Sequence, residues 1–183
     1  MKIKDLRLAI SATPKKPDIR FYLNGVNVTK DTIVGSDGCR LCHVHTYINK
    51  LPSDHENIIV PTDTIKALLK KVGTKHEGAE VAIFLVNGRY ELQCMAQIEV
   101  FTPIDHKLPA FKKHLDSVKN NIHRKESLNN IKHQFDWQYV SQADSAISKY
   151  IGNSIPKKLY STDQLGYFMP SIDIIYIVMP VRG

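Results

Sequence analysis

Apolar residues recur at helical spacing in four segments of this chain, with polar or basic residues at the positions between them. The clearest segment has its apolar residues at i, i+3, i+4 and i+7, namely Ile65, Leu68, Leu69 and Val72. Thr62 precedes them and is expected to cap the helix that they predict. The same spacing predicts helices over residues 5–12, 109–123 and 140–151.

Other segments alternate apolar and polar residues, as strands with one buried face do. Asn24-Gly25 and Asn87-Gly88 each follow such a segment, and Asn-Gly is the strongest short signal for a hairpin turn. A return strand is therefore expected to begin at Val26. Further strands are expected over residues 19–23, 39–48, 81–86, 90–100 and 172–179, and a strand with a turn over 157–164.

Helix, strand, Asn-Gly and strand occur in this order twice. Phe21-Tyr22-Leu23-Asn24-Gly25 matches Phe84-Leu85-Val86-Asn87-Gly88 in position and residue type. Internal duplication is the economical explanation, because two such units can bury a shared apolar face. We expect an α+β fold made of repeated helix-plus-antiparallel-strand units. Its expected parts are two half-units over 1–106, a basic helical insert and linker over 107–134, and a third half-unit over 135–183.

Composition narrows the class of protein. Hydrophobic residues make up 43% of the chain and charged residues 23%, as in an ordinary globular protein. No apolar run is long enough to span a bilayer, and charges at residues 2–5 are unlike a signal peptide. Three cysteines are too few for a disulfide framework. These features predict a cytoplasmic protein with no membrane contact.

Positive charge is concentrated in one segment. The formal net charge of the chain is +7, and residues 107–134 alone hold seven Lys or Arg against two Asp or Glu. Such a patch can neutralise phosphates of a nucleic acid. It can equally be a solvated linker without a partner.

Three stretches of the chain are similar to one protein family. They are Tyr176-Ile177-Val178-Met179-Pro180-Val181-Arg182-Gly183, Phe135-Asp136-Trp137-Gln138-Tyr139-Val140, and Ile59-Val60-Pro61-Thr62 together with Glu77-Gly78-Ala79-Glu80-Val81. They resemble bacterial DNA polymerase III beta subunits, the sliding clamps, which typically end in a strand followed by Met-Pro-Met-Arg-Leu. The chain would be a short and divergent relative, as a phage or a mobile element can encode.

The resemblance implies a DNA-clamp-like fold in which helices line the hole of a ring and sheets form its outside. The basic residues on the predicted helices would then face double-stranded DNA; they are Arg7, Lys66, Lys70, Lys71 and Lys149. Binding would be to backbone phosphate and independent of base sequence. An ordinary solvated helix face is the alternative for these residues. Lys112, Lys113 and Lys119 in the insert are further candidates.

The resemblance also assigns a role to the end of the chain. In the family this tail helps to form a groove for peptide motifs of polymerases and clamp loaders, and the matching residues are Met179, Pro180, Val181 and Arg182. Gly183 stands where the family has leucine, which removes an apolar wall. A strand end packed on the core is the alternative. The ring of the family consists of repeated half-units, so a homo-oligomer is expected.

Three functional hypotheses follow. The first is a non-enzymatic, DNA-binding processivity or tethering factor of replication. The second is a clamp-derived protein-interaction module, a phage accessory protein without ring function, with the helix in 107–134 as its docking element. The third is a zinc module or enzyme at Cys39, Cys42, His43 and His45. Strand alternation places Cys42 on the opposite face, and no catalytic motif occurs, so no metal, cofactor or catalytic residue is expected.

Overall fold

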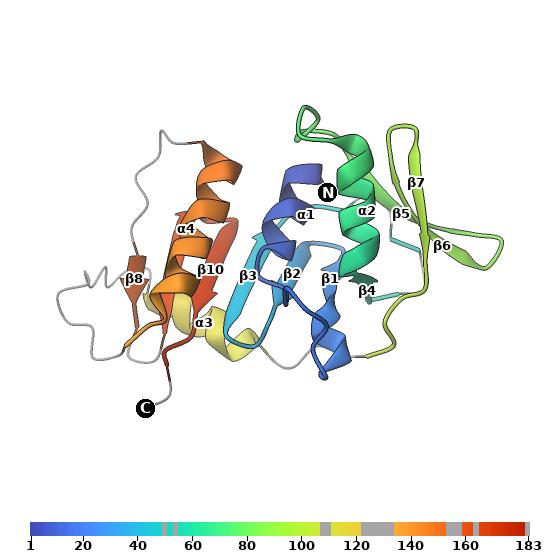
Figure 1. Cartoon of the computed structure of the whole chain (residues 1–183). Helices are drawn as coiled ribbons and strands as arrows, with labels where there is room; N and C mark the ends of the chain where they lie inside the picture. Colours follow the sequence, from blue (N-terminus) through green and yellow to red (C-terminus); the bar gives the residue numbers. More distant parts are fainter. Residues whose placement is uncertain are drawn as a thin grey trace.

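The computed structural model describes residues 1–48, 51–52, 55–106, 111–121, 134–152, 159–162 and 165–181. Its helices are α1 (Ile3–Ile10), α2 (Thr62–Val72), α3 (Lys112–Asn121) and α4 (Trp137–Ile151), with a short 3-10 helix η1 (Phe21–Asn24). Its strands are β1 (Gly25–Thr29), β2 (Thr32–Ser36), β3 (Arg40–His45), β4 (Asn57–Pro61), β5 (Val81–Val86), β6 (Arg89–Cys94), β7 (Gln97–Phe101), β8 (Leu159–Ser161), β9 (Gly166–Ser171) and β10 (Ile174–Val178). Figure 1 shows their arrangement.

The strands form two antiparallel sheets. One is seven-stranded, in the order β4-β1-β2-β3-β10-β9-β8, and the other is three-stranded, in the order β5-β6-β7. Pairing of β3 with β10 places Leu41 opposite Ile177 and His43 opposite Ile175. The first and last parts of the chain therefore share one sheet, although they are far apart in the sequence (Figure 1).

A helix followed by three strands occurs repeatedly along the chain. The groups are α1 with β1, β2 and β3, then α2 with β5, β6 and β7, and finally α4 with β8, β9 and β10; β4 is an additional strand that pairs with β1. This arrangement confirms the predicted α+β fold of repeated helix-plus-antiparallel-strand units. The boundaries assigned to the three parts stay a prediction.

The first Asn-Gly pair does not form a hairpin. The predicted strand over 19–23 is wrong, because residues Phe21–Asn24 form η1 and Gly25 already begins β1 with an extended φ of −143°. The Asn24 side chain accepts a hydrogen bond from Asp18 N (2.8 Å) and donates one to Asp18 O (2.9 Å). An asparagine side chain thus replaces the backbone pairing that a strand would make.

The second Asn-Gly pair forms the predicted turn, with φ of 50° at Asn87 and 76° at Gly88. The single strand expected over 90–100 is wrong, because a second turn at Met95, with φ of 54°, separates β6 from β7. Cys94 pairs with Gln97 across this turn, so the buried face changes from even to odd positions. Ile98 and Val100 are consequently exposed.

Helix α2 has the predicted apolar face, since Ile65, Leu68, Leu69 and Val72 are all buried. The predicted cap is wrong: Pro61 is the N-cap residue, with φ of −56° and ψ of 137°, and Thr62 lies in the first turn. Of the helix predicted over 109–123, residues Lys112–Asn121 form α3, and 109–110 and 122–123 lie outside the described residues. The same holds for 124–133 of the predicted linker. Among the helices described, none is long and apolar enough to cross a bilayer.

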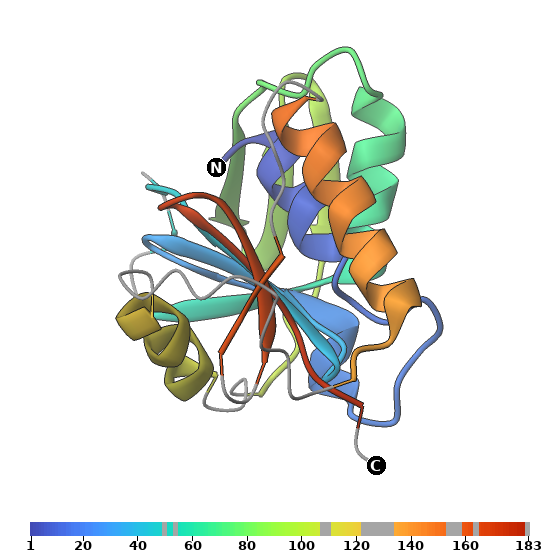
Figure 2. The same ribbon diagram turned by 90° about the vertical axis from the view of Figure 1, so that its left-hand side faces the viewer.

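The helices lie in two layers. Helices α1, α2 and α4 cover one side of the sheets, and α3 lies on the opposite side of the seven-stranded sheet (Figure 2). Leu115 and Val118 of α3 are buried in a small core with residues of β2, β3 and β10. The larger core lies under the other three helices. Gly35 lets α1 approach β2 closely, because a Cβ atom there would lie 2.1 Å from Ala9 O.

Candidate functional site

Basic side chains gather on the helix layer formed by α1, α2 and α4. Lys66, Lys70 and Lys71 are exposed on α2, and Lys149 is exposed on α4. A cavity of about 760 Å³ lies beside α1 and α4, and its lining includes Lys4, Arg7, Lys15, Gln142, Lys149 and Tyr150. Four of the twelve lining residues are basic and one, Glu77, is acidic. The hollow is therefore suited to an anionic group.

Acidic neighbours reduce the free charge of some of these residues. Arg7 Nε lies 2.8 Å from Glu77 Oε1, and Arg7 Nη2 donates a hydrogen bond of 3.1 Å to Gly73 O. On α2, Lys71 Nζ lies 2.7 Å from the Oε1 atom of Glu99, and Lys66 Nζ lies 3.6 Å from the exposed carboxylate of Asp63. The Lys66–Asp63 pair is exposed, and exposed pairs are weak and can exchange for a phosphate contact, whereas Glu99 is only 17% exposed.

A buried carboxylate connects α1 to α4. Tyr150 of α4 donates a hydrogen bond of 2.8 Å to Asp5 Oδ1, and the backbone N–H of Lys2 donates one of 2.8 Å to Asp5 Oδ2. Burial, and after it the neighbouring Asp5 carboxylate, raises the pKa of the Tyr150 hydroxyl, which stays a donor. Lys4 Nζ lies 4.6 Å from the centre of the Tyr150 ring. These contacts fix the two walls of the basic cavity relative to each other.

A second, smaller cavity lies near the end of the described chain. Its volume is about 170 Å³, and four separate segments line it. The segment around η1 contributes Arg20, Tyr22 and Leu23. Strands β2 and β3, with the turn between them, contribute Ser36, Gly38, Arg40 and Leu41. Phe111 immediately before α3, His114 of α3 and Met179 after β10 complete the lining. Leu23 and Leu41 are buried apolar residues, so the interior of this cavity is largely apolar.

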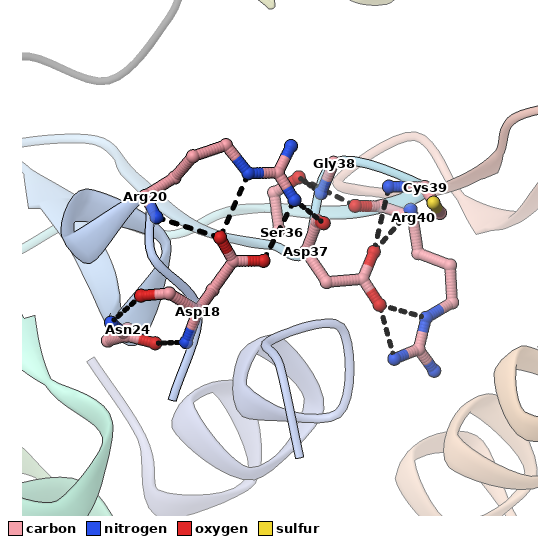
Figure 3. Close-up of polar contacts among 8 residues, drawn as sticks. All are labelled: Asp18, Arg20, Asn24, Ser36, Asp37, Gly38, Cys39 and Arg40. Carbon is pink, nitrogen blue, oxygen red and sulfur yellow. Dashed lines mark hydrogen bonds and ion pairs between the residues drawn. The ribbon is translucent and has the colours of Figure 1, made fainter. Parts of the chain in front are cut away.

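Two carboxylates hold the arginines of this cavity in place (Figure 3). Arg20 donates to both oxygens of Asp18, from Nε to Oδ1 (3.0 Å) and from Nη2 to Oδ2 (2.8 Å), and also to Asp37 O (3.1 Å). Arg40 donates to Asp37 Oδ2 from Nε (2.9 Å) and from Nη2 (2.7 Å). The other carboxylate oxygen, Asp37 Oδ1, accepts from the backbone N–H groups of Cys39 and Arg40. The Arg20–Asp18 pair is bidentate, and several charge-assisted hydrogen bonds of this kind fix side-chain geometry.

The same contacts balance the positive charge of the two arginines that line the small cavity. The hydrogen bonds from Arg20 lower the pKa of Asp18 to about 2, so this carboxylate stays ionised beside the guanidinium. Arg40 is only 3% exposed and donates from Nη1 to Gln142 Oε1 of α4 (2.7 Å). Its guanidinium carbon also lies 4.8 Å from the centre of the Tyr139 ring. Because both arginines already have acidic partners, the cavity favours an apolar ligand group over an anion.

Comparison with known proteins shows which fold this arrangement of helices and sheets is similar to. No family model matches the sequence. Over 138 residues, which are 72% of this chain, it is 28% identical to the beta sliding clamp of Chlamydia muridarum and covers 37% of that relative. The whole chain aligns with the sliding clamp of Pseudomonas aeruginosa at a TM-score of 0.66 and 18% identity, covering 66% of it. A putative DNA polymerase III beta subunit from Eubacterium rectale gives a TM-score of 0.67 at 13% identity, covering 100% of this chain and 65% of that one. The chain has the fold of a bacterial sliding clamp.

The resemblance noted in the sequence is thereby confirmed. The sequence match covers 37% of the Chlamydia relative and the structural match covers 66% of the Pseudomonas clamp, so the chain corresponds to only part of either protein. Within the sliding-clamp fold of this chain, α1, α2 and α4 form one layer and the sheets lie behind them (Figure 2). The resemblance implied this layering for these three helices, but not the position of α3 on the opposite side of the seven-stranded sheet.

The structure does not bring all candidate DNA-binding residues together. Arg7, the three lysines of α2 and Lys149 belong to the helix layer, whereas Lys112, Lys113 and Lys119 lie on α3, on the other side of the seven-stranded sheet (Figure 2). A single surface cannot include both groups. The lysines of α3 were grouped with the others because net charge along the sequence contains no information about the side of a sheet.

The residues predicted to form a peptide groove lie at the end of the described chain, and their role stays a prediction. Met179 lines the small cavity, Pro180 pairs with Phe135, and Val181 is 53% exposed, with its N–H donating to Gln134 O (2.9 Å). Arg182 lies outside the described residues. The lining residues from η1, the β2–β3 turn and α3 were not predicted. The pair Asp37-Gly38 is a turn signal in the sequence, but a turn signal does not indicate a cavity wall.

The cysteines and histidines near β3 do not converge. Cys42 is buried in the larger core, where burial raises the pKa of its thiol, and Cys39 is exposed in the preceding turn. Within the described ranges, no three His, Cys, Asp or Glu side chains lie close enough together to hold a metal ion. His43 lies on the α3 side of the sheet, opposite Val34 and Ile175.

Proposed function

We propose that this chain is a sliding-clamp-like tethering factor of DNA replication that acts in the cytoplasm by binding and not by catalysis. The observation that carries the proposal is the gathering of α1, α2 and α4 on one face of the sheets (Figure 2). Lys66, Lys70 and Lys71 of α2 and Lys149 of α4 are exposed there. Lys and Arg side chains neutralise backbone phosphates whatever the base sequence, so such a face suits duplex DNA. The similarity to beta sliding clamps supports the same role.

The contributions of the individual residues are expected to differ. Lys66 and Lys71 have acidic neighbours at 3.6 Å and 2.7 Å, so part of their charge is already compensated. Lys70 is exposed one helical turn after Lys66, and Lys149 is exposed on α4 beside the basic cavity. We therefore propose that Lys70 and Lys149 contact phosphate most strongly and that Arg7, held by Glu77, fixes the floor of the site.

Replacement of Lys66, Lys70 and Lys71 together by alanine tests the proposal. Duplex binding is measured by fluorescence anisotropy over a range of salt concentrations and with unrelated sequences. Each lost phosphate contact lowers the salt slope by about 0.9, so the partly compensated triplet should lower it by roughly one to two. Affinity should fall by a similar factor for every sequence.

Replacement of Lys112, Lys113 and Lys119 by alanine is the matched control. It removes the same charge from α3, on the opposite side of the sheet, and should leave duplex binding unchanged. Equal losses in the two triple variants would show that net charge, and not the helix layer, attracts DNA. Unchanged binding of the α2 variant would show that the helix layer does not bind DNA.

A homo-oligomer is part of the proposal. One chain presents its helix layer on a single side, so several copies are needed if DNA is to be surrounded (Figure 2). The mass of the protein in solution, measured with and without a duplex, tests this point. A monomer under both conditions would restrict the role to tethering without a ring.

A second binding activity is favoured by the small cavity beside Met179. We propose that it receives one apolar side chain of an extended peptide segment from a polymerase or a clamp loader. The support is a largely apolar interior in which both arginines are already engaged by Asp18 and Asp37 (Figure 3). Burial of one large apolar side chain contributes about 1.5–3 kcal/mol to the binding of such a peptide.

Selection from a random heptapeptide phage library tests the peptide pocket. The library is selected on the wild-type protein and, in parallel, on Met179→Asp, which introduces a charge into the cavity. Peptides that share an apolar residue should be enriched on the wild type alone. Enrichment without any duplex binding would favour the protein-interaction module. Absence of peptides specific to the wild type would refute the pocket.

A further inference from the structure

Helix α3 is an integral part of the folded chain. Leu115 is 6% exposed and Val118 is fully buried, and both pack in one cluster with Leu41, Ile175 and Ile177 of the seven-stranded sheet. Phe111 and Met179 are partly buried and pack against the same cluster. The segment that carries α3 is therefore seated next to the small cavity and not merely tethered near it.

The first turn of α3 holds Phe111 in position. Its carbonyl oxygen accepts hydrogen bonds from the backbone N–H groups of His114 (3.0 Å) and Leu115 (3.1 Å). Phe111, His114, Leu115 and Val118 recur at i, i+3, i+4 and i+7, so they form one face of the helix. The N-terminal residues of this face, Phe111 and His114, line the cavity. The residues that follow on the same face, Leu115 and Val118, are buried against the sheet.

The walls of the cavity thus have two origins. Leu23, Arg40, Leu41 and Met179 belong to the repeated helix-and-strand units or follow them directly, whereas His114 lies on α3, in the opposite layer, and Phe111 immediately precedes this helix. We infer that α3 is a specificity wall, and that Phe111 determines which apolar side chain the pocket accepts. This inference rests on the peptide binding proposed above, and it assigns a role to α3 that DNA binding does not require.

The volume of the cavity indicates what fits. An apolar cavity of about 150 Å³ lined by Leu, Ile and Phe holds benzene. At about 170 Å³, the cavity beside Phe111 has room for a leucine, methionine or phenylalanine side chain, and the larger indole ring of tryptophan is expected to fit less well. Replacement of Phe111 by alanine removes the aromatic ring from the α3 wall and enlarges the space.

The same library selection is carried out on Phe111→Ala. Lys112→Ala is the control, because Lys112 is the next residue in the chain and its side chain is exposed. On the wild type and the control, the shared apolar residue should be leucine, methionine or phenylalanine. On Phe111→Ala, tryptophan should become the preferred residue. A leucine-containing peptide should bind this variant about tenfold more weakly, because apolar contact area is lost.

The outcomes separate the two proposals. Peptides that are enriched on the wild type, with the same anchor residue on Phe111→Ala, would overturn the role of α3 and leave the pocket intact. Absence of wild-type enrichment would overturn the peptide pocket and with it this inference.

A second measurement reports on the wall without a peptide. The sequence contains four methionines, so methyl-labelled protein gives few resonances, and Met179→Leu assigns the one beside the cavity. Loss of the Phe111 ring should move the Met179 methyl signal, while the signals of Met1 and the exposed Met95 stay in place and show that the fold is kept. An unmoved Met179 signal would overturn the inference.

Discussion

The hydrogen bond between Tyr150 and Asp5 is expected to hold the third helix-and-strand unit against the first. Asp5 is 3% exposed, and its Oδ1 accepts from the Tyr150 hydroxyl at 2.8 Å. A hydrogen bond to a charged group contributes about 1.5–3 kcal/mol net. Tyr150→Phe removes the hydroxyl and keeps the ring, so it should lower the free energy of unfolding by about 2 kcal/mol. For a chain of this length, the loss lowers Tm by roughly 4–8 °C.

Urea denaturation of a double-mutant cycle measures this contribution. Asp5→Ala should cost more than Tyr150→Phe, because Asp5 Oδ2 also accepts from the N–H of Lys2 at the start of α1. In the Asp5→Ala background, Tyr150→Phe should cost almost nothing, which gives a coupling energy of about 2 kcal/mol. Tyr47→Phe is the control, because Tyr47 is 77% exposed.

The tyrosine series can refute the reasoning directly. If Tyr150→Phe costs less than about 0.5 kcal/mol, as a surface substitution does, the buried carboxylate does not hold α4 to α1. The same conclusion follows if Tyr150→Phe costs equally much with and without the Asp5 side chain. A drop similar to that of Tyr47→Phe would indicate a general effect of losing a hydroxyl.

Two further predictions concern the seven-stranded sheet. Burial, and after it the charge of Lys119, lowers the pKa of the His43 imidazole to about 4, so protonation favours the unfolded chain. The free energy of unfolding should therefore fall by up to about 3 kcal/mol as the pH decreases from about 6.5 to 4. In urea titrations at several pH values, His43→Leu should remove this dependence. An equal pH dependence of the variant would contradict this. Gly35→Ala places a Cβ atom 2.1 Å from Ala9 O and should lower the free energy of unfolding by about 3 kcal/mol or more. Gly78→Ala is the control and should change stability little, because the space around Gly78 is open. Similar unfolding midpoints for the two variants would refute the close packing of α1 on β2.

The helices could be predicted from the sequence because their signal is local. The four apolar residues of α2 are buried as their spacing indicates, and the apolar face of α3 begins at Phe111. Hydrophobic spacing identifies the buried side of a helix, but not the side of the sheet on which the helix lies. For this reason α3 and its lysines were placed with the other basic residues, although they lie on the opposite layer (Figure 2).

The errors in the strands have local physical causes. At Asn24 a side chain satisfies the backbone of Asp18 and forms part of η1, which competes with a hairpin. At Met95 the chain turns with a positive φ in a residue that rarely adopts it, so no turn signal was present. The apolar residues stay at even positions on both sides of the turn, as in Leu92, Cys94, Ile98 and Val100. The sequence pattern therefore does not reveal that the buried face changes to odd positions after Met95.

The small cavity could not be predicted because its walls meet only in the folded chain. Leu23, Leu41, Phe111 and Met179 are separated by long stretches of sequence and become neighbours when β10 pairs with β3 and α3 packs on the sheet. The resemblance identified Met179 alone among them. The partners of Arg20 and Arg40 are closer in sequence, yet their role as fixed walls depends on the same pairing.

Lysine footprinting with and without duplex DNA tests the central proposal most directly. Acetic anhydride modifies accessible lysines, and mass spectrometry reports the extent of modification at each one. Binding of DNA to the helix layer predicts slower modification of Lys66, Lys70 and Lys149 in the presence of a duplex, with no change at Lys112 and Lys113 of α3. Protection of the α3 lysines with unchanged α2 and α4 would contradict the account.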